Sequence, residues 1–328
     1  MRRLALLMVL VMTGVACTSS APAGSPTQTP PTPPTPIASP SPRGAPSASP
    51  SPEAAPAVPR FRARNALEVI EALVALGPRE TTSVTYRRAS ALVAGRFEQL
   101  GYDVRFQDFD VPQGSVDGVA APAGRTRNVV AEPPGFDPRA PHLVVGGHLD
   151  SVPDSPGAND NASGIGVMVE LARLARGHPP RLPVVFVAFA AEERRRQTRT
   201  RSDTFLGALT YLAEQDRARA RALRGMLNLD MVGNGDEVLV LGERGGPITA
   251  ALLASARRLT IPARPTTISF GYSDHQAFVD AGIPVGWLWA GDHPSLHTPR
   301  DTIDVIQPVQ LRRIGRVAWE TLRTLRLS

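Results

Sequence analysis

The sequence reads Gly-Gly-His-Leu-Asp-Ser at residues 146–151 and Asn-Asp-Asn-Ala-Ser-Gly at residues 159–164. An apolar run precedes the first segment, and its two glycines predict a buried strand that stops abruptly. Apolar residues at helical spacing follow the second segment, which favours a helix starting there. We therefore expect His148 and Asp150 at the carboxyl end of a strand, and Asp160 at the turn into a helix.

The edge of a sheet formed by the carboxyl ends of its strands is where open α/β proteins bind ligands. His148 and Asp150 alternate with Leu149, so their side chains can share one face of the strand end. This spacing suits a metal-binding histidine whose other ring nitrogen is held by the aspartate. Taken alone, such a pair is more often a hydrogen-bonded loop than a metal site.

The rest of the chain alternates between strand-like and helix-like segments. Residues 183–190 are almost purely apolar, as expected for a central strand buried on both faces, and they lead into Glu192 and Glu193. Residues 225–230 form another such strand and end in Asp230. The alternation predicts an α/β three-layer sandwich with a mostly parallel central sheet and helices on both faces.

The remaining predicted elements frame that sheet. Helices are predicted at residues 65–76, 84–100, 205–215, 248–259, 273–281 and 309–325, and further strands at 102–111, 127–131, 143–145, 237–241 and 283–289.

Acidic and imidazole side chains thus follow several strands of one sheet. The last strand leads into a loop at residues 292–301 that carries His293 and His297. Adjacent carboxylates such as Glu192 and Glu193 repel one another, and they need solvent or a cation nearby. Oxygen and imidazole donors without thiolate suit zinc, or manganese or cobalt in its place.

Five motifs together resemble peptidase family M28, the zinc metallopeptidases related to Streptomyces and Aeromonas aminopeptidases. They are Gly-His148-Leu-Asp150-Ser, Asn-Asp160-Asn-Ala-Ser-Gly, Ala-Glu192-Glu193, Asn-Leu-Asp230-Met and His297-Thr-Pro-Arg-Asp. They occur in the family's order, and the resemblance extends over residues 63–325. It implies the zinc-peptidase (phosphorylase/hydrolase-like) fold and two Zn²⁺ ions per chain.

By motif position, the resemblance assigns five metal ligands. Asp160 would bridge the ions, His148 and Asp230 would complete one site, and Glu193 and His297 would complete the other. A water between the two cations would then attack the peptide carbonyl.

Two further roles follow from the resemblance, and a third role departs from it. Glu192 would be the general base, and Asp150 would orient the first histidine, while Asp274 is expected to support the ligands. Several family members carry a tyrosine before the last histidine, where it stabilises the oxyanion. Here that position is Leu296, and the role is left open between Tyr272 and His293.

The N-terminal part of the chain does not have the composition of a folded domain. Residues 1–17 have a basic start, a short apolar run and a final Cys17, which resembles a bacterial lipoprotein signal peptide. Residues 18–59 are rich in Pro, Ser, Thr and Ala and predict a disordered tether. Residues 60–328 would be the peptidase domain. This organisation predicts an extracellular protein anchored to the cell membrane through lipidated Cys17, with ordinary secretion as the alternative.

Charge and composition limit the partners. All 36 basic residues are arginine, and only 5% of residues are aromatic, which gives no stacking platform for nucleic acid. Residues 194–201 hold five arginines directly after the glutamate pair, and we expect these to be exposed. They form either a solvated loop or a device that steers acidic peptides.

The leading functional hypothesis is a monomeric aminopeptidase that acts on peptide substrates. One rival is a glutaminyl cyclase, which uses one zinc ion on the same fold. The other is a catalytically inactive binding lipoprotein, which would be expected to have lost some of the ligands.

Overall fold

The computed structural model describes residues 59–195, 204–243, 245–267 and 273–327. Its centre is an eight-stranded sheet. In spatial order the strands are β1 (Asp103–Val111), β4 (Gly124–Glu132), β6 (Val184–Phe189), β5 (His142–His148), β7 (Leu223–Leu229), β10 (Val285–Trp289), β8 (Val238–Leu241) and β9 (Ala263–Pro265).

The middle of this sheet is parallel and its edges are mixed. Strands β6, β5, β7 and β10 run in one direction, so their carboxyl ends meet at one edge. The flanking strands β4 and β8 run antiparallel to their inner neighbours β6 and β10. The predicted α/β class is confirmed as a mixed sheet whose parallel part carries the motifs.

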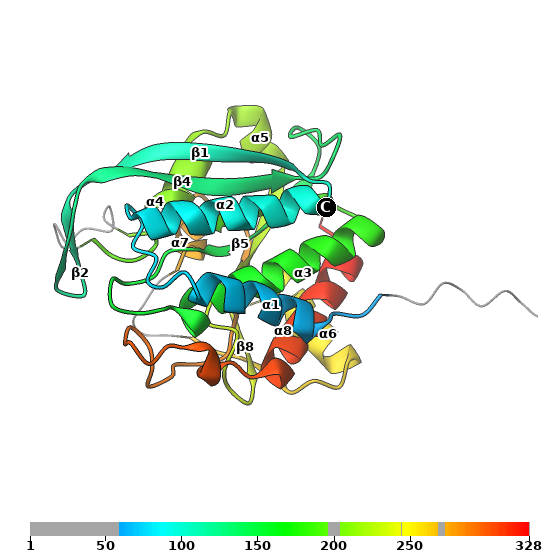
Figure 1. Cartoon of the computed structure of the whole chain (residues 1–328). Coiled ribbons are helices and arrows are strands. Elements are labelled where there is room, and N and C mark those ends of the chain that lie inside the picture. The colour runs from blue at the N-terminus through cyan, green and yellow to red at the C-terminus, as the bar shows by residue number, and fades with distance from the viewer. Residues whose placement is uncertain (1–58, 196–203, 244, 268–272, 328) are drawn as a thin grey trace, which may run out of the picture. The chain divides into compact units, whose positions relative to one another are not determined.

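Helices cover both faces and complete the three layers. Those on one face are α1 (Ala63–Val74), α2 (Val84–Gln99), α3 (Ser163–Gly177), α6 (Pro247–Arg258) and α8 (Pro308–Thr324). Those on the other are α4 (Leu206–Ala213) and α7 (His275–Asp280), which Figure 1 shows behind the sheet.

The sequence of β6 explains this layering. Val184, Phe186 and Ala188 pack into the core under α1, α2 and α3, whereas Val185 and Val187 pack toward α4 and α7. A strand with apolar residues at every position is suited to burial on both faces. Phe186 has no exposed surface and lies 5.6 Å from the Tyr102 ring, measured between centroids.

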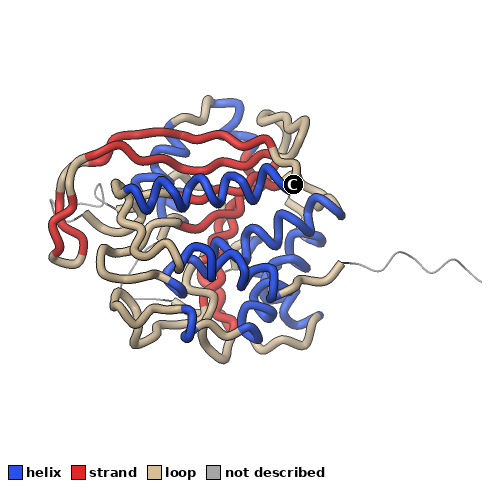
Figure 2. Tube along the Cα trace, in the orientation of Figure 1, coloured by secondary structure: helices blue, strands red, loops and turns tan. Residues whose placement is uncertain are grey.

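Small elements missing from the predicted set complete the fold. They are the edge strand β9, η1 (Ala158–Ala162), α5 (Arg217–Ala222), η3 (Ile303–Val305) and the hairpin of β2 (Gly114–Val116) and β3 (Val119–Ala121). Asp117 and Gly118 form the hairpin turn with φ values of 49° and 85°. Positive φ at both central residues is typical of the turns that close two-residue hairpins. Figure 2 shows this hairpin at the far end of the long ribbon formed by β1 and β4.

The predicted leader, Cys17 and nearly all of the tether lie outside the described residues, so these assignments stay predictions. Across the part of the chain that is described, no helix has both the length and the apolar character needed to cross a bilayer.

Candidate metal centre

The ends of β5 and β6 lie side by side, because their parallel register pairs His148 with Phe189. The His148 ring is buried, and its Nδ1 lies 3.1 Å from the Asp150 carbonyl oxygen and 3.8 Å from the carboxylate. That carboxylate accepts hydrogen bonds from the backbone N–H groups of Glu192 and Glu193, at 3.3 and 3.2 Å. Asp150 therefore holds the histidine ring with its carbonyl group and the end of β6 with its carboxylate.

The turn η1 presents Asp160 and is fixed from two sides. The Asp301 carboxylate accepts hydrogen bonds from the backbone N–H groups of Asp160 and of the preceding residue, at 3.0 and 2.9 Å. The side chain of Asn161 donates to the Leu229 carbonyl oxygen at the end of β7 and accepts from Gly164 N–H. A Cβ at Gly164 would lie 2.3 Å from that same carbonyl oxygen, so the turn approaches β7 as closely as glycine permits.

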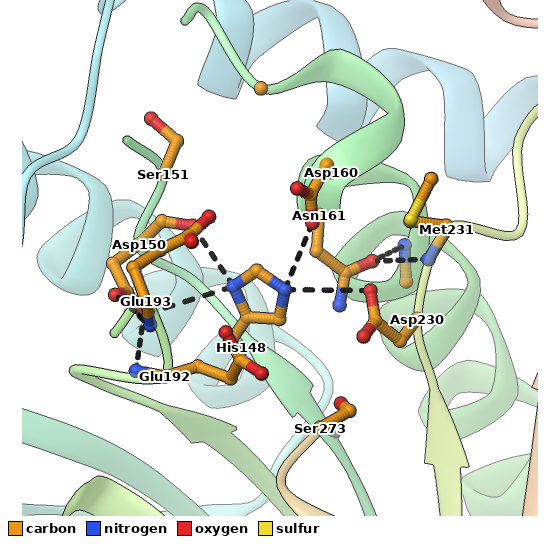
Figure 3. Close-up of polar contacts among 12 residues, drawn as sticks. His148, Asp150, Ser151, Asp160, Asn161, Glu192, Glu193, Asp230, Met231 and Ser273 are labelled. Carbon is orange, nitrogen blue, oxygen red and sulfur yellow. Dashed lines mark hydrogen bonds and ion pairs between the residues drawn. The ribbon is translucent and has the colours of Figure 1, made fainter. Parts of the chain in front are cut away.

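All five predicted metal ligands converge in the structure. His148 Nε2 lies 3.1 Å from one Asp160 carboxylate oxygen and 3.4 Å from the Asp230 carboxylate. His297 Nε2 lies 3.2 Å from the other Asp160 oxygen and 3.4 Å from the Glu193 carboxylate. Figure 3 shows the His148 ring pointing between Asp160 and Asp230. The two oxygens of Asp160 thus face two different histidines, and Asp160 belongs to two three-residue groups that could hold a metal ion. A third such group joins His148 to Glu192 and Glu193.

The charges in this cluster favour a cation. Burial lowers the pKa of His148, but attraction from Asp230 and Glu192 outweighs it and holds this pKa well above the usual value. For His297, burial again acts downward, while hydrogen bonding to Asp160 and attraction from Glu193 raise the pKa to about 10. Such shifts mean that the surrounding carboxylates stabilise positive charge.

Two oxygen atoms of the cluster have no hydrogen-bond partner among the described residues. They are Glu193 Oε1 and Asp230 Oδ1; both are buried, and Asp230 Oδ1 has only the ion-pair contact with His148 Nε2 at 3.4 Å. Burial raises the pKa of the Glu193 carboxyl group well above its usual value, and the charge of Asp160 adds to that rise. Buried carboxylate oxygens without donors are costly unless a cation binds them. The donor set therefore fits a bound metal.

Asp274 lies close enough to this cluster for the charges of His148, Asp150 and Asp230 to act on it. It is completely buried, and neither carboxylate oxygen has a hydrogen-bond partner in the described structure. Burial raises its pKa well above the usual range, whereas the charge of His148 lowers it. The preceding Ser273 accepts a hydrogen bond from Asn228 at 2.8 Å, which ties this segment to β7.

The structure does not assign the oxyanion-stabilising role to either candidate, Tyr272 or His293. Leu296 is partly buried and packs against the apolar cluster that includes Trp287 and Trp289. His293 Nδ1 lies 2.7 Å from the Ser295 hydroxyl group within its own loop. Tyr272 lies outside the described residues.

Arg79 is a supporting residue that the sequence motifs did not reveal. Its guanidinium group is fully buried and donates to the carbonyl oxygens of Leu149, Pro156 and Gly157. Burial lowers its pKa to about 10, while attraction from Asp150 and Asp301 acts in the opposite direction. Arg79 thus fixes the loop between His148 and Asp160, although it lies about seventy residues earlier in the chain.

The prediction that all arginines of residues 194–201 are exposed was wrong for Arg195. Its side chain is 1% exposed, and it pairs with Glu80 at 2.7 Å. It also donates to the carbonyl oxygens of Pro112 and Pro122, which flank the β2–β3 hairpin. Arg194 is exposed, as predicted, and residues 196–203 lie outside the described residues.

Residues 128–322 match peptidase family M28, and the chain belongs to this family. It is 33% identical over 186 residues to aminopeptidase YwaD of Bacillus subtilis, covering 53% of this chain and 38% of that protein. A second relative is named probable lipoprotein aminopeptidase LpqL, from Mycobacterium tuberculosis. It is 31% identical over 51% of this chain and 35% of its own length. The chain therefore spans less than half the length of these relatives.

Solved structures support the fold. The zinc aminopeptidase BSAP from Bacillus subtilis superposes with a TM-score of 0.70 at 20% identity, covering 81% of this chain and 95% of BSAP. A glutaminyl cyclase from Fimbriiglobus ruber superposes with a TM-score of 0.68 at 24% identity, covering 85% and 99%. Because both sequence identities are low, these matches establish only the architecture. They do not distinguish an aminopeptidase from a glutaminyl cyclase.

Arg195→Met should lower the free energy of unfolding by about 3–5 kcal/mol, because it leaves a partly buried Glu80 and two carbonyl oxygens without their partner. Arg194→Met is the matched control, and it should change stability by less than about 0.5 kcal/mol because Arg194 is exposed. Urea unfolding of both variants measures the difference. Equal midpoints would contradict the structural role of Arg195.

Proposed function

We propose that the chain is a two-zinc aminopeptidase that removes N-terminal residues from peptides. The observation that carries this proposal is that Asp160 belongs to two groups of three possible ligands, one with His148 and Asp230 and one with Glu193 and His297. His148 and Asp230 would complete one zinc site, and Glu193 and His297 would complete the other. Three protein ligands per ion leave coordination positions free for water and substrate, as catalytic zinc sites require.

The chain's own residues would divide the chemistry between them. Bound zinc would polarise the scissile carbonyl group and lower the pKa of a nearby water. Glu192 would take the proton from the attacking water and pass it to the leaving amine. Burial raises the pKa of the Glu192 carboxyl group well above its usual value, and the charge of Glu193 adds to this. The Asp150 carboxylate would fix the position of Glu192 by accepting a hydrogen bond from the Glu192 backbone N–H.

The purified protein should contain two zinc ions and release free amino acids from aminoacyl peptides. Zinc analysis combined with a panel of peptides with different N-terminal residues tests both statements. Ammonia release from glutaminyl peptides without peptide cleavage would instead identify a glutaminyl cyclase. A protein that holds zinc but neither cleaves nor cyclises any peptide would be an inactive binding lipoprotein.

Glu192→Gln should retain two zinc ions and lose turnover by about 10²–10⁴-fold, the usual contribution of a general base. Glu193→Gln is the matched control, because it changes the adjacent residue in the same way but removes a proposed ligand. It should lose one zinc ion. Zinc content and kcat of the two variants, measured side by side, decide the assignment. The opposite pattern would mean that the two glutamates exchange roles.

We also propose that lipidated Cys17 anchors the protein outside the cell. The proposal rests on the predicted signal peptide and is consistent with a relative named as a lipoprotein. The proline-rich segment 18–59 would then separate the catalytic domain from the membrane. If fully extended as polyproline helix, it would reach about 130 Å at roughly 3.1 Å per residue.

Cys17→Ser should move the protein from the membrane fraction into the medium, because a serine cannot receive the lipid. Fractionation of a bacterial culture with and without detergent extraction measures this distribution. If the variant still requires detergent for its release, the anchor lies elsewhere.

A further inference from the structure

The hairpin of β2 and β3 brings a carboxylate to one of the proposed zinc ligands. Asp117, in the hairpin turn, places Oδ2 2.5 Å from Nδ1 of His297. The other ring nitrogen of His297, Nε2, faces Asp160 and Glu193. The two residues of this pair are far apart in the chain, and no motif connects them.

The two histidines of the site differ in how they are supported. His148 ends a buried strand and is 1% exposed, so packing and Asp150 fix its ring. His297 lies in a loop with a left-handed backbone φ of 56°, and its side chain is 36% exposed. Because local packing does not enclose this ring, its orientation depends on a partner from elsewhere in the chain.

The hairpin is itself held firmly in place. Arg195, two residues after Glu193, donates to Pro112 and Pro122 on either side of the hairpin. Gly114 lies directly against this arginine, since an added Cβ would be 3.2 Å from Arg195 Cβ. Val116 and Ala121 also pack on Val152, which follows the first motif. The hairpin is therefore attached to the same strand ends that carry the metal ligands.

We propose that Asp117 is a positioning residue that orients His297 for the second zinc ion. By accepting a hydrogen bond from Nδ1–H, the carboxylate leaves the Nε2 lone pair free for the metal and fixes the direction of the ring. Its negative charge also makes the imidazole a stronger ligand. This inference rests on the proposed two-zinc function and extends it to a residue outside the five family motifs.

Zinc titration of the metal-free protein tests the role of Asp117. Asp117→Ala should weaken binding of one of the two zinc ions by about 10–100-fold and leave the other unchanged, as loss of a carboxylate behind a histidine ligand typically does. Asp117→Asn keeps an oxygen that accepts the Nδ1–H bond, so it should recover part of the lost affinity. Asp110→Ala is the matched control, because Asp110 is an exposed carboxylate on the strand that leads to the hairpin. It should bind both ions as the wild type does.

A readout independent of zinc follows the hydrogen bond itself. The wild type and Asp110→Ala should give a downfield imidazole N–H proton resonance from His297 in the metal-free protein, and Asp117→Ala should lose it. Unchanged affinity for both zinc ions in Asp117→Ala would overturn the proposal, even if this resonance disappears. If the wild type binds a single zinc ion, the two-zinc function fails; a retained resonance in Asp117→Ala would then overturn the pairing separately.

Discussion

The site depends on the contacts that the Asp160 carboxylate makes with two histidines. Its two oxygens lie 3.1 and 3.2 Å from Nε2 atoms of two different histidines, so a small rotation would disrupt both groups of donors. The fold restricts that rotation. Asp301 binds the backbone of the turn, and Asn161 ties the same turn to the end of β7. The position of Asp160 is therefore set by hydrogen bonds between side chains and backbone groups that link the turn to two distant parts of the chain.

The parallel centre of the sheet explains why so many carboxylates collect at one edge. Strands β5, β6 and β7 run in the same direction, and each ends in the acidic or imidazole residues of one motif. Burying these acids together is unfavourable, because burial and mutual repulsion raise the pKa values of Glu192, Glu193 and Asp274. The histidines offset part of this cost, and the proposed zinc ions would offset more. The buried carboxylates thus destabilise this part of the fold, and the same negative charge attracts cations to the site.

Sequence patterns predicted what depends on local order and missed what depends on distant contacts. Strands 183–190 and 225–230 have strong apolar runs that stop at acids, so the edge carrying the ligands could be located. Arg195 was expected to be exposed because its neighbours are arginines, yet three acceptors far away in the chain bury it. Arg79 lies outside every motif. The Asp117-Gly118 pair is a hairpin signal, but its flanking strands are only three residues long, too short to show alternation.

The central claim is that Asp160 bridges two zinc ions, and anomalous X-ray scattering from zinc-loaded crystals tests it most directly. The account predicts two anomalous peaks about 3.5–4 Å apart, as in other two-metal sites, with one oxygen of Asp160 next to each peak. The account also predicts that one peak lies next to His148 and the other next to His297. A single peak, or two peaks that Asp160 does not join, would contradict the account.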